Sequence, residues 1–314
     1  MAVGDNIKKR RYELKMSQQE LADLMGYKTR STIAKIESGE NDVTQKKLQK
    51  FAAVLDTTPA ALISGYTADN EGAFLKAESA SERQNKNAVI ILAGGKSGRN
   101  RQNIPSQFIN VNGKPILVYC MEVYQNHPLV DDIYVVCLKG WEGIVKAYAT
   151  QYGITKLRGM VLSGSSGMAS LKNGVDYIKQ VYKKDDLVII QEATRPMVSA
   201  EMVSHLLQTG KSKGSATVSH LMDDYVQFDV SSGKPRSLNR ESIIALQSPE
   251  VHRLDIITNV FEKANRLGHR LGESCFTMLM YNLGYDINFI EGNVNNIKIT
   301  REEDIAAFGA LTRE

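Results

Sequence analysis

A run of small and basic residues follows one strongly apolar segment, and such residues can bind a phosphate group. The apolar segment 88–93 leads directly into the run Ala93-Gly-Gly-Lys-Ser-Gly-Arg99. Glycines allow backbone amides to approach an anion closely, and the lysine and arginine add positive charge. The spacing matches neither the dinucleotide fingerprint GxGxxG nor the phosphate loop GxxxxGK followed by serine or threonine. The run therefore predicts an anion-binding loop but does not by itself identify the ligand.

A helix with a well-defined start is predicted near the amino terminus. Ser17 and Glu20 have the spacing of a capping box, in which the serine accepts from the amide three residues on and the glutamate reaches back. The residues that follow predict a buried apolar stripe and a glycine stop: Leu21, Leu24, Met25 and Gly26.

A second short helix is predicted over residues 31–37, ended by Gly39, with Ile33 and Ile36 facing inward. Two short helices joined by a tight turn that contains glycine form the helix-turn-helix layout. Another amphipathic helix is expected from Val43 to Leu55.

Two different patterns divide the chain. Residues 1–66 are helical throughout, 67–87 are polar and small and predict a linker, and 88–314 alternate apolar strands with helices. The strands are expected at 88–95, 132–138, 186–191 and 216–221, and the helices near 115–126, 142–152, 168–183 and 200–213. This alternation predicts an α/β domain with right-handed crossovers and a mostly parallel sheet.

The composition excludes several classes of protein. The 314 residues suffice for about two domains, and 42% of them are hydrophobic, which excludes full disorder. No apolar run approaches the roughly 20 residues of a membrane helix, and the start lacks the apolar core of a secretory signal. Three dispersed cysteines without a CxxC pair argue against a zinc ribbon or disulfide scaffold, so we expect a cytoplasmic protein. Residues 1–66 hold 11 Lys and Arg against 8 Asp and Glu, a weak sign of a nucleic-acid partner.

The segment of about residues 4–65 resembles the Cro/C1-type helix-turn-helix repressor family, through Gln19-Glu-Leu-Ala and Ile33-Ala-Lys-Ile-Glu-Ser-Gly39. The resemblance implies a recognition helix over Arg30–Ser38 that binds double-stranded DNA as a dimer. Arg30 is expected to contact guanine and Lys35 a phosphate, and the alternative is a bundle that only contacts protein. The candidate DNA-binding residues are Lys28, Thr29, Arg30, Ser31, Thr32 and Lys35.

The rest of the chain, about 88–314, resembles the cytidylyltransferases that use CTP, in particular the methylerythritol-phosphate and ribitol-5-phosphate families. The resemblance rests on five ordered motifs: ILAGGKSGRNRQNIPSQFINVNGKPIL, SGSSGMASLKNGV, QEATRPMVS, LNRESIIALQSPEV and EGNVNNIKITREEDI. It implies a Rossmann-like nucleotidyltransferase fold and transfer of a cytidylyl group from CTP to a polyol or sugar phosphate, with release of pyrophosphate.

The resemblance also assigns roles by position. The triphosphate and cytosine would be bound by Ala93, Gly94, Gly95, Lys96, Ser97, Gly98, Gly164, Ser170 and Ala193. The catalytic cations would be Arg99, Arg240 and Lys298, of which the last two grip the acceptor phosphate. Glu192 stands where the family holds Mg²⁺ with an aspartate. The alternative for Arg240 and Lys298 is a pair of surface cations.

The sequence departs from the family at transition-state positions. The lysine that normally contacts the α-phosphate is Ser106, and loss of one such donor typically costs about 10²–10³ in rate. Glu192 replaces an aspartate, Cys275 aligns with another aspartate, and Glu250 replaces a glutamine. Lys96 and Arg101 lie near the missing lysine in the sequence.

Residues 220–239 predict a β-hairpin arm, because Val226, Phe228 and Val230 alternate before the turn at Ser231. In the families resembled, such an arm exchanges between subunits, so a homodimer is expected; the alternative is an ordinary edge hairpin.

Three functions remain open from the sequence. The chain is a DNA-binding regulator whose cytidylyltransferase-like domain binds CTP or a polyol phosphate with little chemistry, or it is an active cytidylyltransferase with an appended DNA-binding module. In the third, the larger domain only dimerises the DNA-binding module.

Overall fold

The computed structural model forms two compact units. The described residues are 3–27, 29–41, 43–55, 57, 62, 85–95, 104–222, 227–229, 234–236 and 243–313. The predicted linker lies mostly outside them, so the domain boundaries at 66 and 88 stay predictions. No helix in these ranges has the length and apolar character needed to span a membrane.

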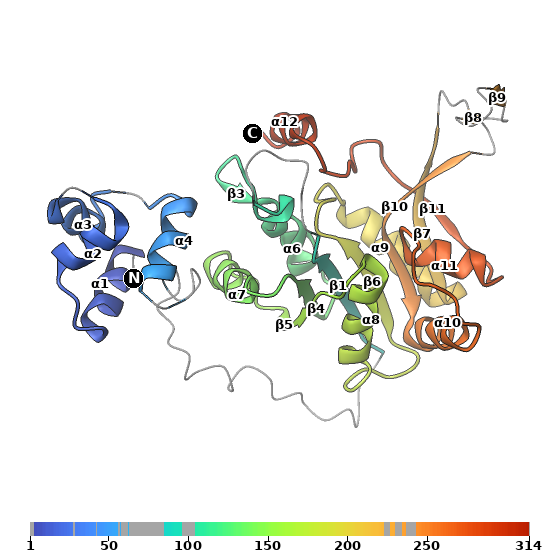
Figure 1. Cartoon of the computed structure of the whole chain (residues 1–314). Coiled ribbons are helices and arrows are strands. Elements are labelled where there is room, and N and C mark those ends of the chain that lie inside the picture. Colours follow the sequence, from blue (N-terminus) through green and yellow to red (C-terminus); the bar gives the residue numbers. More distant parts are fainter. Residues whose placement is uncertain are drawn as a thin grey trace. The chain divides into compact units, whose positions relative to one another are not determined.

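The amino-terminal unit contains a helical bundle (Figure 1). Its helices are α1 (Val3–Glu13), α2 (Gln18–Met25), α3 (Arg30–Glu37) and α4 (Gln45–Val54). The capping box at Ser17 and Glu20 is confirmed, and Gly26 ends α2 with φ of +74°, a left-handed conformation that glycine adopts without strain.

The core of this bundle is apolar, and the described residues of the bundle include a buried ion pair between Arg11 and Glu37. Ile7, Leu21, Ile33 and Phe51 meet in the core, as the inward faces predict, whereas the prediction for Leu24 is wrong, because its side chain is 54% exposed. The buried stripe of α2 consists of Leu21, Ala22 and Met25, so Ala22 takes the buried position that was predicted for Leu24.

The second unit is built on a seven-stranded sheet in the order β11-β7-β10-β6-β1-β4-β5 (Figure 1). The strands are β1 (Asn87–Ala93), β4 (Asp132–Cys137), β5 (Leu157–Leu162), β6 (Leu187–Glu192), β7 (Ser215–Leu221), β10 (Ile244–Arg253) and β11 (Phe289–Glu291). In this sheet only β10 runs antiparallel to its neighbours, which confirms the expected mostly parallel arrangement.

Helices lie on both faces of the sheet because the strands alternate between two buried sides. Ile90, Val136 and Ile190 pack against α8 and the carboxyl-terminal helices, whereas α9 approaches the opposite face at Leu187 and Val251. The helices that follow β1 along the chain are α6 (Ile116–Asn126), α7 (Glu142–Gln151), α8 (Gly167–Ile178), α9 (Ala200–Lys213), α10 (Leu254–Arg266), α11 (Phe276–Asn282) and α12 (Glu302–Leu311).

Short elements complete the unit. They are the 3-10 helix η2 (Ser106–Phe108) and the pairs β2 (Asn110–Val111) with β3 (Lys114–Pro115) and β8 (Gln227–Asp229) with β9 (Lys234–Arg236). The antiparallel pairing of β8 and β9 confirms a hairpin within the predicted arm, while Val226 and Val230 lie outside the described residues.

The chain enters the sheet through several polar contacts. The backbone amide of Lys86 donates to Asp186 Oδ1 at 2.8 Å, and that of Asn87 donates to Asp131 Oδ2 at 2.8 Å. The Lys86 ammonium also pairs with Asp132 at 3.2 Å. These carboxylates hold the first residues of β1 at the edge of the sheet opposite the edge where β1 ends.

Candidate functional site

The glycine run begins where β1 ends, at the carboxyl edge of the sheet. Ala93 is buried, and a Cβ added to Gly94 would lie 2.4 Å from the Cβ of Ser163, so only glycine fits this approach. Gln107 Nε2 donates to the carbonyls of Ala93 at 2.6 Å and Gly95 at 3.2 Å. The side chain after Ser106 thus anchors the start of the loop. The remaining predicted loop residues, Lys96, Ser97, Gly98 and Arg99, lie outside the described residues.

A second loop, after β5, lies beside the first. The amide of Gly164 donates to Ser170 Oγ at 3.0 Å, and that hydroxyl donates to the Ser166 carbonyl at 2.8 Å. The same hydroxyl is 3.5 Å from where a Gly94 side chain would begin. Ala193 is buried, and its amide donates to the Leu92 carbonyl at 3.1 Å. The structure therefore brings Gly94, Gly164, Ser170 and Ala193 to one edge.

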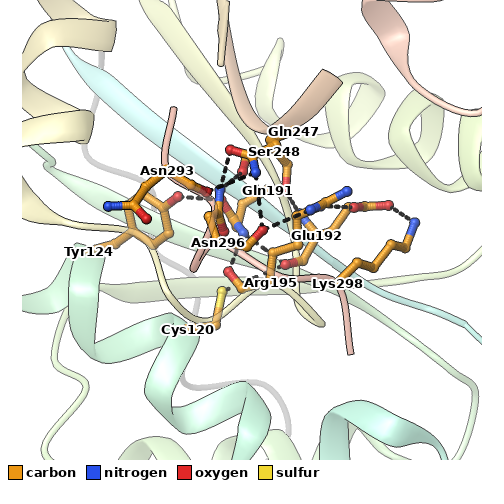
Figure 2. Close-up of polar contacts among 10 residues, drawn as sticks. All are labelled: Cys120, Tyr124, Gln191, Glu192, Arg195, Gln247, Ser248, Asn293, Asn296 and Lys298. Atoms are coloured by element: carbon orange, nitrogen blue, oxygen red, sulfur yellow. Dashed lines mark hydrogen bonds and ion pairs between the residues drawn. The ribbon is translucent and has the colours of Figure 1, made fainter. Parts of the chain in front are cut away.

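Glu192, at the end of β6, accepts from two cations (Figure 2). Its Oε2 accepts from Arg195 Nε at 2.9 Å, and its Oε1 is ion-paired with Lys298 Nζ. The Lys298 side chain is 43% exposed. Two predicted site residues, 106 positions apart in the sequence, therefore meet directly. Arg240 lies outside the described residues.

The turn that carries Glu192 is held by a buried glutamine. Gln191 accepts from the Tyr124 hydroxyl at 2.7 Å and donates to the carbonyls of Glu192 at 2.8 Å and Arg195 at 2.9 Å. The Glu192 amide donates to Ser248 Oγ at 3.1 Å, which joins β6 to β10. These hydrogen bonds explain how the neutral Gln191 side chain orders the turn.

The divergent positions Ser106, Cys275 and Glu250 are also placed by the structure. Ser106 is buried at the first residue of η2. Cys275 precedes α11, and burial, with the charges of Glu250 and then Glu192, raises the pKa of its thiol to about 11. The thiol is therefore protonated at neutral pH and does not replace the negative charge of an aspartate.

Glu250 is buried under the first turn of α11. It accepts from the amides of Phe276 at 3.1 Å and Thr277 at 2.8 Å, and His252 Nε2 lies 3.3 Å away. Burial alone would raise the pKa of Glu250, but the hydrogen bonds from His252, Thr277 and Phe276 outweigh it, so the pKa is lowered. Glu250 therefore fixes the start of α11 beside Cys275.

The candidate nucleic-acid interface is the amino end and outer face of α3. Thr29, Arg30, Ser31 and Lys35 are exposed, and Thr29 Oγ1 lies 2.8 Å from Ser31 Oγ. Thr32 is half-buried, and Lys28 lies outside the described residues.

The inner side of α3 is fixed by a charge pair. Arg11 donates to Glu37 through Nε at 2.7 Å and through NH2 at 2.9 Å, and Gln18 Nε2 donates to the same carboxylate at 2.8 Å. This bidentate pair ties the end of α3 to α1, and Gln18 joins α2 to it.

Comparison with solved structures defines the class of the larger unit. It has the Rossmann-like nucleotidyltransferase fold. A 4-diphosphocytidyl-2C-methyl-D-erythritol synthase from Anaerococcus prevotii superposes with a TM-score of 0.64 at 21% identity, over 73% of this chain and 97% of that one. A CMP:2-keto-3-deoxy-manno-octonic acid synthetase superposes with a TM-score of 0.54 at 18% identity, over 72% and 98%.

Sequence comparison identifies the family. The model of the 2-C-methyl-D-erythritol 4-phosphate cytidylyltransferase family matches residues 87–314, and the chain belongs to that family. A helix-turn-helix family model matches residues 7–62.

Two curated relatives cover most of the larger unit. A ribitol-5-phosphate cytidylyltransferase of Lacticaseibacillus paracasei is 29% identical over 228 residues, 72% of this chain and 97% of the relative. A 2-C-methyl-D-erythritol 4-phosphate cytidylyltransferase of Clostridium botulinum is 30% identical over 221 residues, 70% and 94%.

Three residues that contact the predicted site were not among the residues predicted from the sequence: Arg195, Ser248 and Asn296. Arg195 lies within a quoted motif, and its position three residues after Glu192 was the available signal. Ser248 and Asn296 also lie within quoted motifs, but no local spacing indicated their contacts, because these join segments about 50 to 100 residues apart.

Proposed function

We propose that this protein is a cytoplasmic DNA-binding regulator whose cytidylyltransferase domain binds CTP and a polyol phosphate and transfers the cytidylyl group only slowly. The observation that carries the proposal is the Glu192–Lys298 ion pair beside the glycine loop, which supports a phosphate site, together with serine at position 106. The substrates for which the two curated relatives are named supply the substrate class.

In the proposed complex the nucleotide lies at the carboxyl edge of the sheet. The loop from Ala93 to Gly98 surrounds the triphosphate, and Arg99 stabilises its developing charge. Gly164, Ser170 and Ala193 line the cytosine pocket. The proximity of Gly94, Gly164 and Ser170 supports this assignment, because a single ligand at that edge reaches all three.

The acceptor phosphate is proposed to bind Lys298 and Arg240. A phosphate has the charge and the acceptor oxygens to replace the Glu192 carboxylate as the partner of the exposed Lys298 ammonium. An acceptor oxygen then attacks the α-phosphorus of CTP, and pyrophosphate leaves. The protein contributes orientation and charge neutralisation, the main sources of catalysis in such transfers.

Glu192 fits a Mg²⁺ ion as a single protein ligand. Mg²⁺ is commonly held by one or two carboxylates together with substrate phosphates. Among the described residues no group of three or more acidic, histidine or cysteine side chains is placed to hold a metal, and Cys275 adds no negative charge at neutral pH. When bound, the ion would neutralise charge on the triphosphate. Lys298 must leave Glu192 to free one of its oxygens.

The amino-terminal unit is proposed to bind double-stranded DNA as part of a homodimer. The exposed side chains of α3 support base and phosphate contacts, with Arg30 reading guanine and Lys35 a phosphate. Helix-turn-helix modules bind two half-sites, so a dimer presents two recognition helices to one operator.

The deciding experiment measures chemistry and binding separately. The protein is incubated with CTP, Mg²⁺ and either ribitol 5-phosphate or methylerythritol 4-phosphate. Calorimetric binding with pyrophosphate release far below that of a ribitol-5-phosphate cytidylyltransferase is expected. DNA affinity is then measured with and without ligand at fixed salt, where a change is expected. Absence of binding to both CTP and DNA contradicts the proposal.

A second candidate is an active cytidylyltransferase with an attached DNA-binding module. It is favoured by 29% to 30% identity over nearly the full length of two curated enzymes. Pyrophosphate release at the rate of such enzymes selects this candidate.

The substitution Ser106→Lys tests whether the missing lysine is the cause of slow cytidylyl transfer. A lysine donor to the α-phosphate is expected to raise the turnover rate by up to about 10²–10³-fold. Asn110→Lys, at an exposed position two residues after η2, is the control for a general effect of charge. An unchanged rate for Ser106→Lys removes the missing lysine as the cause of slow transfer.

A further inference from the structure

Lys298 lies on a segment without regular secondary structure. The segment runs from Gly292, after β11, to Arg301, before α12, and is called here the Lys298 strap. No ladder of backbone hydrogen bonds fixes such a segment, so the place of the Lys298 ammonium depends on individual contacts.

Asn296 makes most of those contacts and is completely buried. Its carbonyl accepts from Arg195 NH1 at 2.8 Å, and its side-chain Nδ2 donates to the Ser248 carbonyl at 2.8 Å (Figure 2). Its own amide donates to the Asn293 carbonyl at 3.0 Å. One residue therefore joins the strap to the turn after β6 and to β10.

The Asn296 side chain anchors the strap through its donor Nδ2 and not through its acceptor Oδ1. Within the described part of the chain, Asn296 Oδ1 is buried without a hydrogen-bond partner, which costs stability. The reverse amide orientation would place oxygen against the Ser248 carbonyl. An apolar residue would avoid the unpaired oxygen but would lose the bond to β10.

The strap is also fixed beyond Lys298, because the amide of Ile299 donates to the Thr194 carbonyl at 2.8 Å and Ile299 is buried. Lys298 is thus held between two anchors, Asn296 and Ile299. Arg195 connects the strap to Glu192, since it donates to both the Glu192 carboxylate and the Asn296 carbonyl.

We infer that Asn296 is a positioning residue, which sets the Lys298 ammonium for the acceptor phosphate without touching the substrate. The inference rests on the proposed function, because it needs a phosphate acceptor that Lys298 binds. It predicts that loss of the Asn296 side chain weakens binding of the acceptor and leaves nucleotide binding intact, since the nucleotide residues lie on other loops.

The test is calorimetric binding of ribitol 5-phosphate, methylerythritol 4-phosphate and CTP to the full chain. Asn296→Ala is expected to weaken binding of the acceptor by about 10- to 100-fold, as a misplaced binding group does, with an unchanged Kd for CTP. Asn295→Ala is the matched control, because Asn295 is its exposed neighbour on the same strap. If the alanine variant does not fold, Asn296→Ser is used with the same expectation.

A double-mutant cycle with Lys298→Ala separates positioning from a general loss of structure. If Asn296 acts through Lys298, the double variant binds acceptor no more weakly than Lys298→Ala alone. Additive losses, or an equal loss of CTP affinity, overturn the inference while the proposed function stands. A wild-type chain that binds neither acceptor nor CTP overturns the proposed function and this inference together.

Discussion

At the scale of single residues, His127 makes the stability of the α/β unit depend on pH. Its Nδ1 accepts from the Leu129 amide at 3.2 Å, so the ring is neutral with the proton on Nε2, which faces the Ala200 carbonyl at 3.2 Å. Burial, and to a lesser extent the charge of Lys156, lowers the pKa of His127. The unfolded chain therefore binds the proton more readily than the folded one.

We predict that this contribution to stability is complete above pH 6.5, the ordinary pKa, and is lost as the pH falls toward the lowered value. Urea unfolding at several pH values measures it. His127→Gln, whose amide keeps an acceptor and a donor, should flatten this part of the profile, whereas Gln208→Asn, at an exposed position of α9, should not. An equal slope for both variants contradicts the assignment.

Arg30 and Lys35 are exposed on the same helix, but we predict different effects on DNA binding. Arg30→Ala should cost about 1–3 kcal/mol and relax the preference at one base pair. Lys35→Ala should weaken binding to all DNA sequences alike and reduce the slope of log affinity against log salt concentration by about one. Binding to operator and random duplexes over a series of salt concentrations distinguishes them. Identical changes for both variants would show that neither reads a base.

At the scale of elements, the Arg11–Glu37 pair joins α1 to α3. The side chains are 5% and 2% exposed, so loss of one partner leaves a buried charge. We predict that Glu37→Gln destabilises the helical unit by about 3–5 kcal/mol and weakens DNA binding. Thermal unfolding and DNA titration measure both effects.

Glu13→Gln is the matched control for this prediction. It breaks the Arg10–Glu13 pair on the same helix, whose side chains are 30% and 34% exposed, and should cost less than about 1 kcal/mol. Equal losses for the two glutamate variants would show that burial of the Glu37 pair has no special effect.

Elements with a strong apolar period were predictable from the sequence, and irregular ones were not. β1, β4, β6 and β7 are continuous apolar or β-branched runs and lie within about two residues of their expected bounds. β5 contains Arg158 and Gly159, and β10 contains Pro249 and a register shift near Gln247, so neither has a strand pattern.

The candidate site was predictable where the family motifs carry it. Those motifs led to Gly94, Glu192 and Lys298, which the structure places at one edge of the sheet. The hydrogen bonds of Gln191 and Asn296 depend on tertiary contacts between segments distant in the sequence, which no local pattern encodes.

At the scale of the whole molecule, the β8–β9 hairpin is the proposed link between subunits. Replacement of residues 226–237 by a Gly-Ser segment is predicted to give a monomer in sedimentation equilibrium. The monomer should bind a two-half-site operator about 10²-fold or more weakly, because the second half-site no longer binds intramolecularly. A variant that stays dimeric would place the subunit contact elsewhere.

The anchoring of Lys86 and Asn87 has a mechanical consequence. β1 is a central strand, hydrogen-bonded in parallel to β4 on one side and β6 on the other. Tension applied to the chain ahead of Lys86 and directed along β1 therefore shears two ladders at once instead of opening one pair after another.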